Sequence, residues 1–126
     1  MDTPASSALK YFHGFSALVE RLAKGGVVLR RLSCDWSVFG SWTIEVSNND
    51  DEAKRSAAIQ RKEYDGPGPE VFRISWDGKD RELQMESTPT GVISMLNRWR
   101  SLDHRHCDSG EVALEVAEEW FYARLR

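Results

Sequence analysis

Apolar residues recur at helical spacing near each end of the chain. Between Ser7 and Lys24 they return every three or four positions, which predicts a helix with one apolar face. Gly25-Gly26 follows it, and glycine readily adopts the left-handed conformation that ends a helix. A second helical pattern begins after residues 108–111, Asp-Ser-Gly-Glu, which resemble a capping box, and continues to the C-terminus. We therefore expect one amphipathic helix at each end.

Alternation with a period of two predicts strands between these helices. Residues 27–36 are rich in β-branched and apolar side chains. Residues 42–46 alternate large apolar side chains with polar ones, as a half-buried strand does. Residues 37–41 have the composition of a turn, so we expect these two strands to pair as a hairpin.

A second hairpin is predicted from residues 72–86. Phe72, Ile74 and Trp76 alternate with polar residues, and after a turn Leu83 and Met85 do the same. This pattern places the five apolar side chains on one face, where they can be buried. The polar residues between them are then expected to point to the other side of the sheet.

The register of this second hairpin depends on its turn. A two-residue turn at Gly78-Lys79 pairs Ile74 with Leu83, whereas a turn one residue earlier places Arg81 opposite Ile74. Each apolar side chain left exposed forfeits roughly 1.5–3 kcal/mol, which favours the first register. Glycine at the first turn position also suits a type II′ turn.

Four other segments are less regular. Residues 52–64 fit either a short helix or a solvated strand, and we favour the helix. Residues 65–69 contain two prolines and two glycines, which predicts a loop. Thr88-Pro89 resembles a helix start, so we expect a further helix that ends near Leu102. Residues 103–108 are then a polar link.

The predicted order is α-β-β-(α)-β-β-α-α in a single α+β domain, residues 1–126. Hairpins imply antiparallel pairing, and amphipathic helices need an apolar surface to cover. We expect a four-stranded antiparallel sheet with helices packed on one face, and an open second face that is free to contact a partner.

Charge is unevenly distributed over the two halves of the chain. Residues 1–63 contain 9 basic and 8 acidic side chains (9 − 8 = +1), and residues 64–126 contain 8 and 12 (8 − 12 = −4), which together give the net charge of −3. The acidic second half favours a basic partner. The chain has no apolar run of the ~20 residues that a membrane helix needs and no signal-peptide pattern, so we expect a cytoplasmic protein.

Two cysteines and nearby histidines are the main candidates for chemistry. Candidate zinc ligands lie close together at His104, His106 and Cys107. The paired spacing of ligands in a tetrahedral site is absent, so we expect no metal and no cofactor. Cys34 could act as a nucleophile if one of these histidines lay beside it. A reduced cysteine that fills the core is the simpler interpretation, and we expect no enzyme activity.

A basic cluster, residues Arg98 to His106, follows the predicted third helix. Its simplest role is to stabilise the end of that helix by cations. Contact with RNA or phosphate is the alternative, with exposed tryptophans available for stacking. Because the whole chain is acidic, we consider a nucleic-acid partner the less favoured interpretation.

The first hairpin resembles a known class of protein. Cys34-Asp35-Trp36, then Gly40 and then residues 42–46 (Trp-Thr-Ile-Glu-Val) look like the corresponding region of immunity proteins from bacterial polymorphic-toxin systems. The resemblance covers the first half of the chain. It implies a non-catalytic inhibitor that binds a toxin domain through surface shape and charge.

The sequence therefore favours a protein-binding module that neutralises a basic toxin domain. The alternatives are a small RNA- or phosphate-binding regulator and a small enzyme that uses Cys34 with a histidine. The expected partner contacts are acidic residues on predicted loops and strand ends, namely Asp50, Asp51, Asp77, Asp80 and Glu82.

Overall fold

The computed structural model describes residues 4–35, 37–48, 57, 60, 61, 70–89 and 99–125. Its elements in chain order are α1 (Pro4–Lys24), β1 (Val27–Asp35), β2 (Ser41–Asn48), β3 (Glu70–Asp77), β4 (Glu82–Pro89), β5 (Arg100–His106) and α3 (Gly110–Leu125). The α+β class and the antiparallel sheet are confirmed, but the sheet has five strands where four were predicted.

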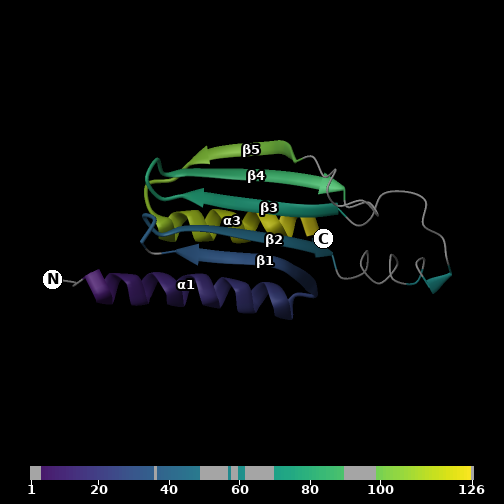
Figure 1. Cartoon of the computed structure of the whole chain (residues 1–126), viewed down its shortest axis with the longest axis horizontal. Coiled ribbons are helices and arrows are strands. Elements are labelled where there is room, and N and C mark those ends of the chain that lie inside the picture. Colours follow the sequence, from purple (N-terminus) through teal and green to yellow (C-terminus); the bar gives the residue numbers. More distant parts are fainter. Residues whose placement is uncertain are drawn as a thin grey trace.

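The five strands form a meander in which each strand pairs with its neighbour in sequence, in the order β1-β2-β3-β4-β5. The helix α3 crosses behind the middle of the sheet, and α1 runs along β1 at one edge (Figure 1). Both helices pack on the same face, as predicted, because the apolar side chains of β2, β3 and β4 and the apolar stripes of α1 and α3 form one cluster. The opposite face carries mostly polar and charged residues, with Val28 of β1 and Val71 of β3 as apolar exceptions.

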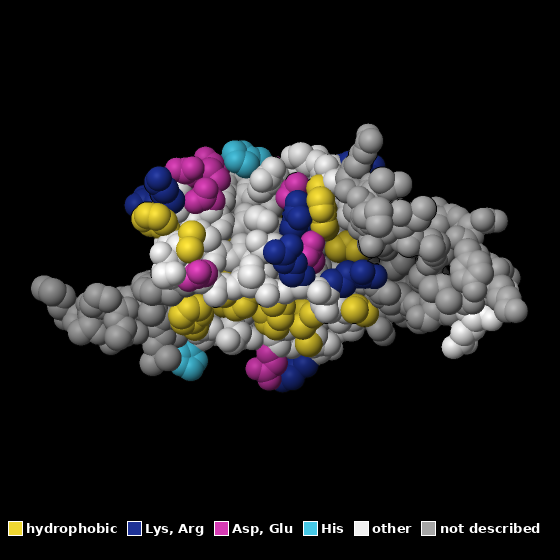
Figure 2. All heavy atoms as spheres, viewed as in Figure 1, with side chains coloured by type: hydrophobic (Ala, Val, Ile, Leu, Met, Phe, Trp, Pro, Cys, Tyr) yellow, Lys and Arg dark blue, Asp and Glu magenta, His cyan; other side chains and the backbone are white. Residues whose placement is uncertain are grey.

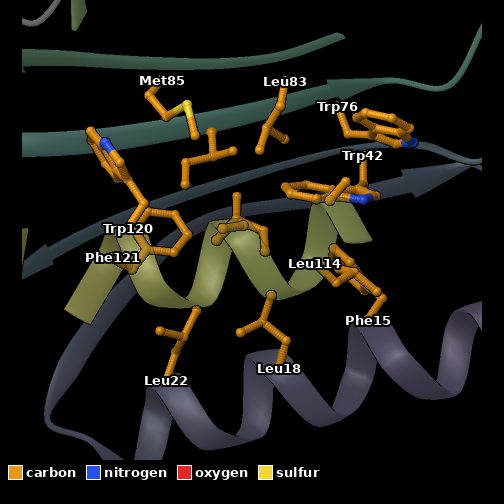
Figure 3. Close-up of a cluster of buried hydrophobic side chains, with 14 of the residues drawn as sticks. Phe15, Leu18, Leu22, Trp42, Trp76, Leu83, Met85, Leu114, Trp120 and Phe121 are labelled. Atoms are coloured by element: carbon orange, nitrogen blue, oxygen red, sulfur yellow. The ribbon is translucent and has the colours of Figure 1, made fainter. Parts of the chain in front are cut away.

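The core lies between the sheet and the two helices (Figure 3). Phe15 of α1 packs against Trp42 of β2, with ring centroids 6.1 Å apart. Trp120 of α3 meets Phe72 of β3 edge to face at 5.8 Å. The predicted inward direction of Phe72, Ile74 and Trp76 is confirmed, since all three are buried in this cluster.

Local hydrogen bonds explain where the two helices end and begin. Gly25 N–H donates to the carbonyl of Arg21 at 3.0 Å, and Gly26 has a φ of 83°, so the predicted glycine stop after α1 is confirmed. At the start of α3, Ser109 Oγ accepts a bond from Val112 N–H at 3.3 Å. The N-cap is therefore Ser109 rather than Asp108, one residue later than the capping-box pattern indicated.

The predicted register of the second hairpin is wrong by two residues. Ile74 pairs with Met85 and Trp76 with Leu83, so four residues, 78–81, connect the strands. Counting from the predicted pair Ile74–Leu83, that register would have placed Trp76 opposite Arg81. The longer turn instead pairs Trp76 with Leu83 and leaves Phe72 opposite Ser87. It keeps the predicted faces because the shift is even.

The predicted helix from Thr88-Pro89 to Leu102 is also wrong in its described part. The strand β4 continues through Pro89, where Thr88 pairs with Val71, and β5 already begins at Arg100. The polar link predicted at residues 103–108 is likewise mostly strand. The pattern misled because β5 is an edge strand with mostly polar side chains, which produce no apolar alternation.

Two further predictions fall largely outside the described residues. Of residues 52–64, only 57, 60 and 61 are described. Ala57 and Gln60 are helical, and Arg61 N–H donates to the Ala57 carbonyl at 3.1 Å, which agrees with the favoured helix at those positions. The predicted loop at residues 65–69 and the helix interior at residues 90–98 lie outside the described chain.

Candidate functional site

Two turns touch each other at one end of the sheet. One is the β1–β2 turn, whose described residues are 37–40, and the other is the β3–β4 turn, residues 78–81. A Cβ atom at Gly78 would lie 1.8 Å from the carbonyl oxygen of Phe39, so only glycine permits this approach. Gly78 N–H also donates to Ser41 Oγ at 3.1 Å. The two turns are therefore fixed relative to each other.

Phe39 is held in an uncommon position at this contact. Its φ is +56°, a left-handed conformation that is an outlier for a bulky side chain, and 65% of its surface is exposed. Its neighbour Val38 is also exposed. The turn that carries them is ordered by Asp35, whose Oδ1 accepts bonds from the N–H and the hydroxyl of Ser37 at 2.9 and 2.7 Å.

Three of the predicted contact residues surround these turns. Asp77 and Asp80 are exposed, and Glu82 is half-buried at the start of β4. Asp77 Oδ1 accepts bonds from the N–H groups of Lys79 and Asp80 at 3.0 and 3.2 Å, which shapes the β3–β4 turn. The structure thus brings together the following residues, which we call the turn surface: Val38, Phe39, Asp77, Asp80 and Glu82.

The other two predicted contacts, Asp50 and Asp51, lie outside the described residues. The last described residue before them is Asn48, which pairs with Val27. This pair lies at the end of β2 that is farthest from Ser41, and therefore far from the turn surface along the strand.

Two histidines of β5 border the turn surface. Glu82 Oε2 lies 3.0 Å from His104 Nε2, and Glu82 Oε1 lies 3.8 Å from His106 Nδ1. His106 Nε2 is also 3.8 Å from Asp108 Oδ1. These contacts become ion pairs when the imidazoles are protonated. Among the residues that the structure describes, no group of three histidine, cysteine or acidic side chains could hold a metal ion.

The basic cluster expected between Arg98 and His106 lies on a strand in its described part. Its described members belong to β5, where alternation sends them to different faces, and Arg98 lies outside the described residues. Arg100 pairs with Glu70 at 3.2 Å, and Arg105 pairs with Asp103 at 2.9 Å. Carboxylates therefore compensate much of the positive charge that a phosphate would need.

Asp103 is held ionised by its surroundings. It accepts a bond from the N–H of His104 at 2.8 Å and from Arg105 at 2.9 Å. These two bonds, the backbone bond first, keep the pKa of this carboxyl below its ordinary value. The negative charge that neutralises Arg105 is thus present at neutral pH.

The open face of the sheet carries alternating charges. Arg31, Glu45, Arg73 and Glu86 lie directly opposite one another on β1 to β4. The separations are 3.9 Å from Arg31 to Glu45, 3.9 Å from Glu45 to Arg73 and 3.0 Å from Arg73 to Glu86. We call this row the charge ladder; alternating basic and acidic side chains cross the middle of the face in Figure 2.

Most tryptophans lie on the other face. Trp42, Trp76 and Trp120 are buried in the core, and Trp36 lies outside the described residues. Trp99 covers the open face, where its ring centre is 3.8 Å from the guanidinium carbon of Arg73. Among the described tryptophans, the open face is therefore covered by one half-buried side chain, which packs on the ladder.

Cys34 is not beside His104 or His106. It lies on β1 and they lie on β5, at opposite edges of the sheet. Four strand spacings of about 4.8 Å separate these edges by roughly 19 Å. Partial burial, together with the charge of Asp35, raises the pKa of the Cys34 thiol to about 11, so the thiol stays protonated at neutral pH. The Cys–His pair considered from the sequence is not assembled.

Sequence reasoning missed the apolar part of the turn surface. Residues 37–41 were expected to turn the chain, but nothing was inferred from the fact that this turn contains Val38 and Phe39. Two large apolar residues inside a turn are the signal that could have found them, because turns are usually polar and solvent-exposed.

Comparison with protein-family models, with curated proteins and with solved structures found no match to this chain. No helix in the described part of the chain is long and apolar enough to cross a membrane.

Proposed function

We propose that this protein is a non-catalytic binding module that holds another protein with its turn surface. The observation that carries the proposal is Phe39, which is largely exposed and strained while Gly78 holds its backbone in place. Exposed aromatic side chains on rigid supports are typical of the few residues that dominate protein interfaces.

The energetics of Phe39 support a role outside the fold. A left-handed conformation costs a residue with a side chain roughly 1–2 kcal/mol relative to the right-handed one, and an exposed ring recovers little of this by burial. Glycine would meet the backbone requirement without that strain. The presence of phenylalanine at such a position is explained when its ring is buried by a partner.

The charges around the ring suggest the chemistry of that partner. Asp77 and Asp80 are exposed next to the turn contact, and Glu82 follows at the start of β4. Lys79 and Arg81 are exposed on the same turn, so these five side chains together carry a net charge of −1 (2 − 3 = −1). A complementary surface would offer an apolar pocket with basic groups on its rim. A basic bacterial toxin domain fits this description. We therefore propose, more specifically, that the binding module is an immunity protein for such a toxin.

The test is coexpression with the product of the adjacent gene, followed by purification and calorimetry. We expect a complex that neutralises the toxicity of that product. Phe39→Gly should weaken the complex by at least tenfold, because the anchoring ring is lost, yet it should not lower the melting temperature. Val112→Ala is the matched control, because it shortens an exposed apolar side chain that lies on α3 and outside the turn surface. This variant should bind normally.

Two outcomes would overturn the proposal. If the neighbouring product is neither bound nor toxic, the immunity role is wrong. If the complex forms equally well with Phe39→Gly, the turn surface is not the binding site.

A further inference from the structure

The strand β1 is an edge of the sheet in the described chain. One side of its backbone pairs with β2, with a bulge between Leu29 and Arg31. From Arg31 to Asp35 the register is regular, and Leu32 on this stretch is 42% exposed. An edge strand presents backbone donors and acceptors to which a further strand can bond.

The helix α1 provides an apolar floor next to this edge. It runs along β1 at the margin of the sheet (Figure 1), and hydrophobic side chains gather along the boundary below the sheet (Figure 2). Leu29 of β1 and Phe12 and Val19 of α1 are only partly buried against the core. A strand added beside β1 could cover these side chains with its own apolar residues.

The charge ladder is incomplete at the same edge. Side chains of Glu45, Arg73 and Glu86 are 11, 21 and 14% exposed, whereas Arg31 is 65% exposed. At the other end, Glu86 lies opposite Ser101 of β5, so an uncharged residue ends the row there. At the β1 end the row stops at Arg31, which in the part of the chain that the structure describes has a carboxylate on one side only.

We propose that the β1 edge accepts an extended segment of another protein in which acidic and apolar residues alternate. Its backbone would bond to β1 in antiparallel or parallel pairing. Its apolar side chains would lie toward α1 beside Leu32, and one of its carboxylates would lie beside Arg31. The alternation of charge across the sheet would then continue by one strand.

A second copy of this chain fits the edge less well. Pairing of two β1 strands would bring Arg30 and Arg31 of both copies to one face, where like charges repel. Pairing of β1 with the β5 edge of a second copy is also unfavourable, because β5 carries Arg100 and Arg105. The carboxylate that β5 offers, Asp103, already binds Arg105. An acidic segment from a different protein is the better complement.

This inference concerns a surface separate from the turn surface and does not depend on the toxin partner. The experiment uses the full chain labelled with nitrogen-15 and two short peptides, one alternating valine with glutamate and one alternating valine with lysine. We expect the acidic peptide to shift the amide signals of β1 and of the facing side of α1. The basic peptide should leave them unchanged.

Two matched variants test the role of the ladder. Arg31→Gln should weaken binding of the acidic peptide roughly threefold to fivefold, the effect of one exposed ion pair. Arg105→Gln removes the same charge from the opposite edge and should leave the affinity unchanged.

Three results would overturn the proposal. The first is the absence of β1 shifts at millimolar acidic peptide, and the second is an equal response to both peptides. The third is concentration-dependent self-association in which the β1 signals move without any peptide, which would identify a second copy as the occupant.

Discussion

The two faces of the sheet are built from alternate residues of the same strands, yet different interactions specify them. On the face toward the helices, Ile44 of β2 lies opposite Ile74 of β3, and both are fully buried. One position along, Glu45 lies opposite Arg73 on the open face. The first face depends on volume and close packing, whereas the second depends on the order of charges. Substitutions at neighbouring positions should therefore have different effects.

The largest effect is expected on the helix-facing side. Ile74→Ala should lower the free energy of unfolding by about 2–5 kcal/mol, because it leaves a cavity in a fully buried site. Ser75→Ala, one residue away on the open face, removes only the acceptor of a long 3.4 Å bond from Thr43 Oγ1 and should cost about 1 kcal/mol or less. Urea denaturation of both variants measures the difference. Similar losses for the two would show that the faces are not distinct.

A smaller but clear effect is expected inside the charge ladder. Arg73→Met removes the cation that Glu45 and Glu86 share from the two neighbouring strands, and should cost about 2–3 kcal/mol, less than the ~3–5 kcal/mol of a fully buried pair. Arg31→Met at the exposed end should cost less than about 1 kcal/mol. The same denaturation experiment compares them. Equal losses of stability for Arg73→Met and Arg31→Met would mean that burial does not set the contribution of each ladder residue.

The smallest effect concerns the one ion pair that joins the helices in the described chain. Arg21 donates to both carboxylate oxygens of Glu118, at 2.7 and 2.8 Å, and Tyr122 donates a third bond at 3.1 Å. These bonds, that of Arg21 first, lower the pKa of Glu118 from its ordinary value of 4.5. The pair therefore stabilises the fold above about pH 4.5, and this contribution is lost as the pH falls through the lowered pKa.

Glu118→Gln should remove this pH-dependent contribution. At pH 7 we expect a loss of about 0.5–1 kcal/mol, since Arg21 is half-exposed. The melting temperatures of the variant and of the unaltered protein should converge in acid. A constant difference at all pH values would show that the ion pair is not its cause.

Most of the fold could be predicted because buried surfaces leave a periodic trace in the sequence. The stripe of α1 and the alternation of Phe72, Ile74 and Trp76 are such traces, and both are confirmed. The strand β5 has no such trace, since its one strongly apolar residue is Leu102 and its basic side chains lie beside carboxylates. The hairpin register failed because the four-residue turn is stabilised by Asp77 and requires a positive φ at Arg81, which apolar spacing does not encode.

The candidate site was predictable only in its charged part. Asp77, Asp80 and Glu82 were expected as contacts because acidic residues near a turn are visible in the sequence, and their role in binding stays a prediction. Phe39 was not, because its exposure depends on the contact between its carbonyl and Gly78, and these residues are distant in the chain. Such contacts between turns are set by the register of several strands together.

The meander also has a consequence for how the chain folds. Each strand pairs with the next one in sequence, so the sheet can grow by successive hairpin formation with modest loss of chain entropy. The two helices come from opposite ends of the chain and must meet beneath that sheet, as the bond between Arg21 and Glu118 shows. The slow, long-range step of folding should therefore be the joining of the two chain ends, and the sheet is the template on which it occurs.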